Sequence, residues 1–167
     1  MPVFLRNALF ALAFGVAVSS PFIDASPATT MEAPVFKEPV QLSLISETST
    51  LRPGHPTWVA LHLKIDDSWH AYWKNPGDAG MAPVVIWNLP EGFETGPLVW
   101  PTPQRFTVGS VTGFGYENDL VFLAQITPPA SFKGTSAQLG ADVRWIVCND
   151  STCLPGDSQT AATIQIK

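Results

Sequence analysis

The chain has 167 residues, 46% hydrophobic and 14% charged, with 16 prolines and 6 tryptophans, which is typical of a folded protein and argues against disorder. The length suits one domain with an appended segment, which we expect to be monomeric. Nine basic side chains against 14 acidic ones give a net charge of -5, so no cationic face is available to neutralise a phosphate backbone, and we expect no nucleic acid partner.

The N-terminal segment has the order of a secretory signal peptide. Arg6 precedes an apolar run over residues 8–18, and small residues follow that run. We expect a signal peptide over residues 1–26 and a flexible leader over residues 27–38, so that the domain lies outside the cytosol, where disulfides persist. The apolar run is shorter than the roughly 20 residues of a transmembrane helix, and an uncleaved anchor is the alternative.

The rest of the chain has the pattern of short β-strands. Residues 57–65, TWVALHLKI, have the two-residue period of a half-buried strand. No helical period follows the leader. Other short segments rich in β-branched or aromatic residues are bounded by turn residues: 41–47, 84–89, 120–126, 141–148 and 162–167. Roughly seven to nine strands over about 130 residues predict an all-β fold, an immunoglobulin-like β-sandwich.

The segment WHAYWKNPGDAGMAP, residues 69–83, follows the first of these strands. In an extended strand its tryptophans share an apolar face, and His70 and Tyr72 lie on the opposite face, before NPGD turns the chain. Two interpretations stay open. Either this is a core strand with an exposed polar face, or His70 and Tyr72 line a shallow partner-binding surface.

The segment VTGFGYEND, residues 111–119, places a glycine on each side of Phe114. This pattern predicts an aromatic side chain at the tip of a glycine-hinged loop, and such loops often carry function. Phe114 either covers another group or packs as an ordinary apolar side chain.

The two cysteines of the chain, Cys148 and Cys153, lie in VRWIVCNDSTCLPGDS. The first ends a strand and turn formers follow it, so a hairpin loop can bring the pair within disulfide reach. Closing so small a ring stabilises a fold by about 2 kcal/mol, against about 4.7 kcal/mol for a 100-residue loop. The spacing leaves open whether the pair is a structural disulfide or a redox-active one.

Metal, nucleotide and hydrolase sites find little support. Two cysteines do not complete a four-ligand zinc site, and the spacing is not the Cys-x-x-Cys of zinc and thioredoxin motifs. His55, His62 and His70 form no recognisable metal set, although His70 with Met81 and a cysteine could bind copper(I), which prefers soft ligands. Nucleotide-binding and nucleophile-elbow motifs are missing. We therefore expect no cofactor and no resident metal.

The chain contains, in this order, the segments WHAYWKNPGDAGMAP, WPTPQRF, GFGYEND and VRWIVCNDSTCLP. Together these four segments resemble the N-terminal periplasmic domain of the DsbD and ScsB family of thiol:disulfide interchange proteins. The resemblance covers about residues 39–167 and implies an immunoglobulin-like redox domain there.

The resemblance implies a periplasmic thiol:disulfide oxidoreductase that needs no cofactor. Its disulfide would take electrons from a membrane-embedded thiol reductase or a thioredoxin-like domain and give them to a periplasmic thioredoxin-fold disulfide protein. Cys153 would form the mixed disulfide with partners, and Cys148 would resolve it. Arg144 is the nearest cation in the sequence, so thiolate activation would depend on the partner. The family is also linked to cytochrome c biogenesis and copper tolerance.

The family carries a cap loop whose phenylalanine shields the cysteine pair. GFGY occupies the matching place, which makes Phe114 the implied cap and Tyr116 its neighbour, and Tyr72 falls where the family keeps a tyrosine beside the site, with His70 on the same surface. The alternatives are a non-enzymatic interaction module with a structural disulfide and a copper-handling protein.

Overall fold

The computed structural model describes residues 38–167. The predicted signal peptide, and the predicted leader except for Glu38, lie outside the described residues. The described part is all-β and forms eleven strands. Within residues 38–167 there is no helix of the length and hydropathy that a membrane span requires.

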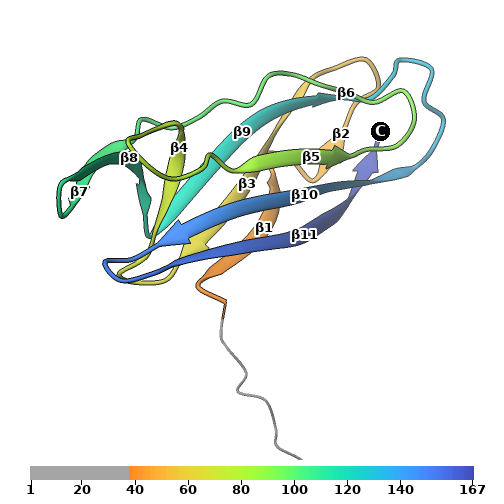
Figure 1. The fold of residues 1–167 in the computed structure, drawn as a ribbon. Coiled ribbons are helices and arrows are strands. Elements are labelled where there is room, and N and C mark those ends of the chain that lie inside the picture. The colour runs from red at the N-terminus through yellow and green to blue at the C-terminus, as the bar shows by residue number, and fades with distance from the viewer. Residues whose placement is uncertain (1–37) are drawn as a thin grey trace, which may run out of the picture. The chain divides into compact units, whose positions relative to one another are not determined.

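The strands form two sheets (Figure 1). The smaller sheet has the order β1-β3-β9-β6, and its strands are β1 (Val40–Ser46), β3 (Thr57–Ile65), β9 (Asp119–Thr127) and β6 (Glu94–Thr95). The larger sheet has the order β2-β11-β10-β4-β8-β7, and β5 also pairs with β10. Its strands are β2 (Thr50–Leu51), β4 (His70–Gly77), β5 (Val84–Asn88), β7 (Gln104–Val108), β8 (Val111–Glu117), β10 (Ser136–Cys148) and β11 (Cys153–Ile166).

The core lies between the two sheets. On β3 the predicted apolar side is buried from Val59 to Ile65, and on β10 the inner side chains include Val143, Trp145 and Val147. Phe122 of β9 is fully buried and meets the Trp100 ring edge to face. Because the alternating apolar faces of both sheets interdigitate, the predicted immunoglobulin-like β-sandwich is confirmed.

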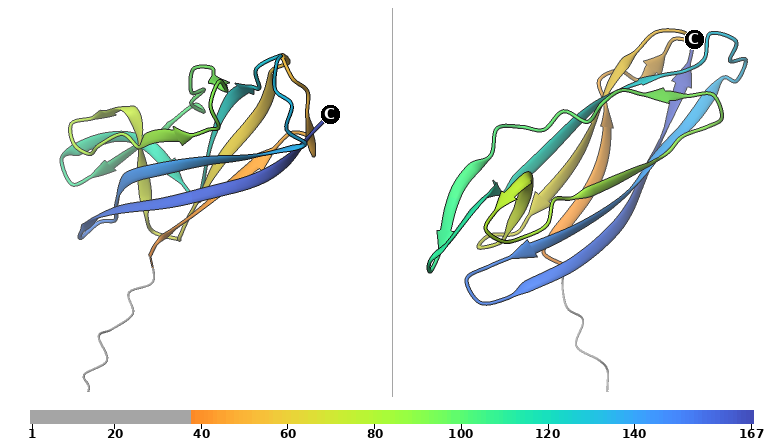
Figure 2. Two further views of the ribbon diagram at one scale, coloured as in Figure 1. Left: turned by 90° about the vertical axis from the view of Figure 1, so that its right-hand side faces the viewer. Right: turned by 45° about the horizontal axis from the view of Figure 1, so that its top comes forward.

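The long β10–β11 hairpin brings the two cysteines to one end of the sandwich. Its antiparallel register runs from Ser136 opposite Gln165 to Cys148 opposite Cys153. The tip of this hairpin and the β7–β8 hairpin lie at the same end of the domain, away from the C-terminus (Figures 1 and 2). The fold therefore gathers the cysteines and β7–β8, which are separated in the sequence, at one end.

The predicted glycine-hinged loop is instead strand β8, which pairs with β7 on one side and β4 on the other. The glycines of β8 leave space for a neighbouring side chain and do not act as hinges. A Cβ added at Gly113 would lie 2.5 Å from the ring of Phe106, which pairs with it across the hairpin. The NPGD turn is also displaced, because β4 continues to Gly77 through a register shift after Tyr72.

Candidate functional site

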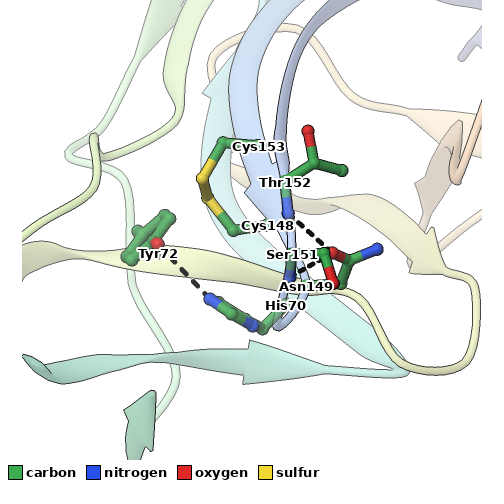
Figure 3. The surroundings of a disulfide bond; sticks show 7 residues. All are labelled: His70, Tyr72, Cys148, Asn149, Ser151, Thr152 and Cys153. Carbon is green, nitrogen blue, oxygen red and sulfur yellow. Dashed lines mark hydrogen bonds between the residues drawn. A yellow bond between two sulfur atoms is a disulfide. The ribbon is translucent and has the colours of Figure 1, made fainter. Parts of the chain in front are cut away.

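The turn that joins the cysteines is held by Asn149. Its Oδ1 accepts hydrogen bonds from the backbone N–H groups of Ser151 and Thr152, each at 2.9 Å. The backbone N–H of Asn149 also donates to the carbonyl oxygen of Thr152 at 2.9 Å. This side-chain turn closes the hairpin, and Cys148 and Cys153, with Cα atoms 4.0 Å apart, form a disulfide (Figure 3).

The two cysteines differ in accessibility. Cys148 is only 3% exposed, whereas Cys153 is exposed. Of the two cysteines, Cys153 is therefore the one that a molecule approaching from solvent can contact more readily.

His70 and Tyr72 lie on the same face of the sheet as the disulfide. His70 is the cross-strand partner of Cys148, and Tyr72 follows it two residues along β4. Their predicted exposure is wrong, because they are 6% and 5% exposed. Figure 3 shows both side chains beside the Cys148–Cys153 bond. The structure thus brings four of the six predicted site residues together.

A residue that the sequence did not single out, Phe106 of β7, covers His70 and Tyr72. Its ring centroid lies 4.1 Å from that of His70 and 5.8 Å from that of Tyr72. The His70 and Tyr72 rings meet edge to face, and His70 Nε2 lies 3.3 Å from the Tyr72 hydroxyl. The sequence feature that could have pointed to Phe106 is the pair of glycines in β8. These glycines leave space for the Phe106 ring and do not serve as hinges for Phe114.

Phe114 and Tyr116 lie on the opposite face of the larger sheet. Tyr116 pairs with Ala71, is buried in the core, and donates a hydrogen bond from its hydroxyl to the Pro101 carbonyl oxygen at 2.9 Å. Burial raises the pKa of Tyr116 to about 12, so the hydroxyl stays protonated. Phe114 shares this face because it is two residues away. The register therefore places both on the core side and Phe106 on the disulfide side.

The backbone at Gly80 covers another side of Tyr72. Gly80 has φ 99°, and a Cβ there would collide with the Tyr72 ring. Only glycine combines this left-handed backbone with so close an approach. Tyr72 is therefore enclosed by Phe106 and by the chain between β4 and β5.

Burial lowers the pKa of His70, and the negative charges of Glu117 and Asp150 partly oppose that shift. His70 is consequently neutral at neutral pH in the disulfide form. Burial also raises the pKa of Tyr72. The face beside the disulfide therefore holds a neutral imidazole and a neutral phenol.

The lowered pKa of His70 predicts a loss of stability in mild acid. The unfolded chain takes up a proton at His70 near pH 6.5, the ordinary histidine value, while the folded chain resists it until the pH is lower. Stability should therefore fall as the pH drops below about 6.5. Urea unfolding at pH 7.5 and 5.5 should show a smaller fall in H70Q, whereas H55Q, which alters an exposed turn, should retain the full fall. Equal sensitivity in H70Q would contradict this account.

Metal-ligating side chains do not converge in the described part of the chain. No group of three or more histidines, cysteines and acidic residues there could hold a metal ion. His62 lies on β3 of the other sheet, 2.6 Å from Asp119, and Met81 is 45% exposed. The copper(I) hypothesis, which combined His70 with Met81 and a cysteine, stays a prediction.

The β-sandwich thus carries its disulfide at the tip of a hairpin, with one buried and one exposed cysteine and aromatic side chains beside the bond. The family described as thiol:disulfide interchange protein DsbD, N-terminal, matches residues 36–165, and the chain belongs to this family. A comparison with curated proteins gave no match.

The solved structures that resemble the chain include two N-terminal domains. The N-terminal periplasmic domain of ScsB from Proteus mirabilis has a TM-score of 0.52 and 19% identity, over 73% of this chain and 44% of that chain. The N-terminal domain of DsbD from Neisseria meningitidis in its reduced form has a TM-score of 0.44 and 11% identity, over 76% of this chain and 85% of that chain. The chain thus spans less than half of the ScsB chain, and the first likeness supports the fold.

Proposed function

We propose that residues 39–167 form a periplasmic redox domain that relays electrons by thiol-disulfide exchange. The donor is a membrane-embedded thiol reductase or a thioredoxin-like domain, and the acceptor is a periplasmic thioredoxin-fold disulfide protein. The observation that carries the proposal is the disulfide with one exposed and one buried cysteine. Membership of the interchange family supports the chemistry, and the ScsB domain, described as periplasmic, supports the compartment, as does the proposed signal peptide over residues 1–26.

The exposure of the two cysteines gives each a role in the exchange. A donor thiolate attacks Cys153 Sγ, the Cys148–Cys153 bond breaks, and the electron pair stays on Cys148. A second donor thiolate then attacks the donor sulfur of the mixed disulfide and releases Cys153, which leaves the donor oxidised and the domain reduced. In the second half-reaction Cys153 attacks the acceptor disulfide, and Cys148 resolves the adduct. Both half-reactions therefore proceed through Cys153, the exposed cysteine.

The aromatic cover suits a domain that must select its partners. Phe106 packs on His70, which faces Cys148, so a small thiol meets apolar surface on this side of the disulfide. A partner protein can displace or contact this surface over a larger area. We assign the cap role to Phe106 rather than Phe114 as part of this proposal.

The reduction potential of the pair tests the proposed function. The purified chain is equilibrated in glutathione buffers of graded potential, free thiols are trapped with a maleimide, and the reduced fraction is read by mass. We expect a midpoint in the range of thiol-disulfide catalysts, about -120 to -270 mV. A midpoint below about -300 mV, typical of structural disulfides, would instead support the interaction module.

A further inference from the structure

Four residues form a row across adjacent strands on the disulfide face. Cys153 pairs with Cys148, Cys148 with His70, and His70 with Glu117, through β11, β10, β4 and β8. Side chains directly opposite in an antiparallel pair share a face, with Cβ atoms about 4.5–5.5 Å apart. The imidazole of His70 is therefore flanked by the sulfur of Cys148 on one side and the carboxylate of Glu117 on the other.

A thiolate at the buried Cys148 would be stabilised by a nearby positive charge. Opening the disulfide leaves a thiolate on a residue that is 3% exposed, and burying an unpaired charge is unfavourable. Arg144, the nearest cation in the sequence, pairs with Val84 and Asp157 farther along the sheet and is exposed. The thiolate of Cys148 therefore forms beside His70 and away from Arg144.

The groups that surround His70 favour its protonation once the disulfide is reduced. They are Glu117 on β8, Asp150 in the hairpin turn and Tyr72 on β4, whose hydroxyl lies 3.3 Å from Nε2, and Phe106 of β7 covers the ring. None of these groups is a cation, and two are carboxylates. A thiolate added to this set favours protonation of His70, as an adjacent negative charge does for any imidazole.

We propose that His70 balances the charge of Cys148 when the disulfide opens, with Glu117 as the positioning residue that favours the charged imidazole. This inference rests on the proposed exchange function. An incoming thiolate bonds to Cys153 Sγ, the Cys148–Cys153 bond breaks, and His70 takes one proton from solvent as the electron pair settles on Cys148 Sγ. When Cys148 re-forms its bond to Cys153, the leaving thiolate departs and His70 returns the proton to solvent.

The thiolate of Cys148 can be titrated alone in a C153S chain, by its ultraviolet absorbance. We expect Cys148 to ionise below about pH 8.5, the ordinary cysteine value. In H70Q/C153S the titration should move up by about one pH unit, a tenfold loss of thiolate at neutral pH, and E117Q/C153S should show a smaller shift in the same direction. H62Q/C153S, altered on the other sheet, should titrate as C153S does. Identical titrations with and without His70 would overturn the proposal.

A second measurement keeps the test valid where H70Q does not fold. The ring signals of His70 in the unaltered chain are followed by NMR against pH in the oxidised and the reduced protein. We expect the pKa of His70 to rise on reduction, and an unchanged pKa would reject the charge pair. Both results are independent of the midpoint potential. A midpoint in the range of structural disulfides would contradict the proposed electron relay, and the two titrations would still decide whether His70 balances the charge of Cys148.

Discussion

Replacement of Cys148 with serine is expected to stop the exchange halfway, because only the exposed Cys153 can start it. With an aromatic disulfide that releases a coloured thiolate, the reduced unaltered chain should release two equivalents: Cys153 forms the adduct and Cys148 resolves it. C148S should release one equivalent and keep the adduct, which mass spectrometry detects. C153S should react slowly, since its remaining thiol is buried. C153S reacting as fast as C148S would contradict the assigned roles.

The double variant C148S/C153S is the stability control for this experiment. A ring closed by cysteines five residues apart stabilises the fold by about 2 kcal/mol in the chain-entropy estimate. Urea unfolding should therefore show a folded protein with a modest loss of stability and no exchange activity. A double variant that fails to fold would show that the disulfide is chiefly structural.

Truncation of Phe106 to alanine is expected to speed reduction of the disulfide by glutathione about tenfold, which corresponds to about 1.4 kcal/mol of barrier. The reason is that its ring covers His70 and Tyr72 beside Cys148. F114A removes a phenylalanine from the opposite face of the β7–β8 hairpin and should leave the rate of reduction by glutathione unchanged. The rates are measured by trapping free thiols at timed intervals.

The comparison of these two variants decides which phenylalanine is the cap. A faster reaction in F114A with an unchanged one in F106A would restore the assignment that the family resemblance implied. Equal acceleration in both would indicate a general loosening of the β7–β8 hairpin, which near-ultraviolet circular dichroism would detect. Either of these results would remove Phe106 from the proposed mechanism.

The strand pattern and the cysteine hairpin could be predicted from the sequence. Alternation in residues 57–65 and 141–148 determined which side chains face the core, because a strand exposes its two faces with a period of two. Turn-forming residues such as Asn149 placed the two cysteines opposite each other. These features depend on neighbours in the chain, so local patterns suffice to predict them.

The surroundings of the disulfide were decided by the tertiary structure. Periodicity put His70 and Tyr72 on one face of β4, yet what covers that face depends on the register between β4, β8 and β7. The same register turned Phe114 to the core side and Phe106 to the disulfide side. Contacts such as Cys148 with His70 join strands far apart in the chain, and only the folded sheet aligns them. The sequence by itself thus determined the strands and the cysteine pair, whereas cross-strand pairing decided which groups surround that pair.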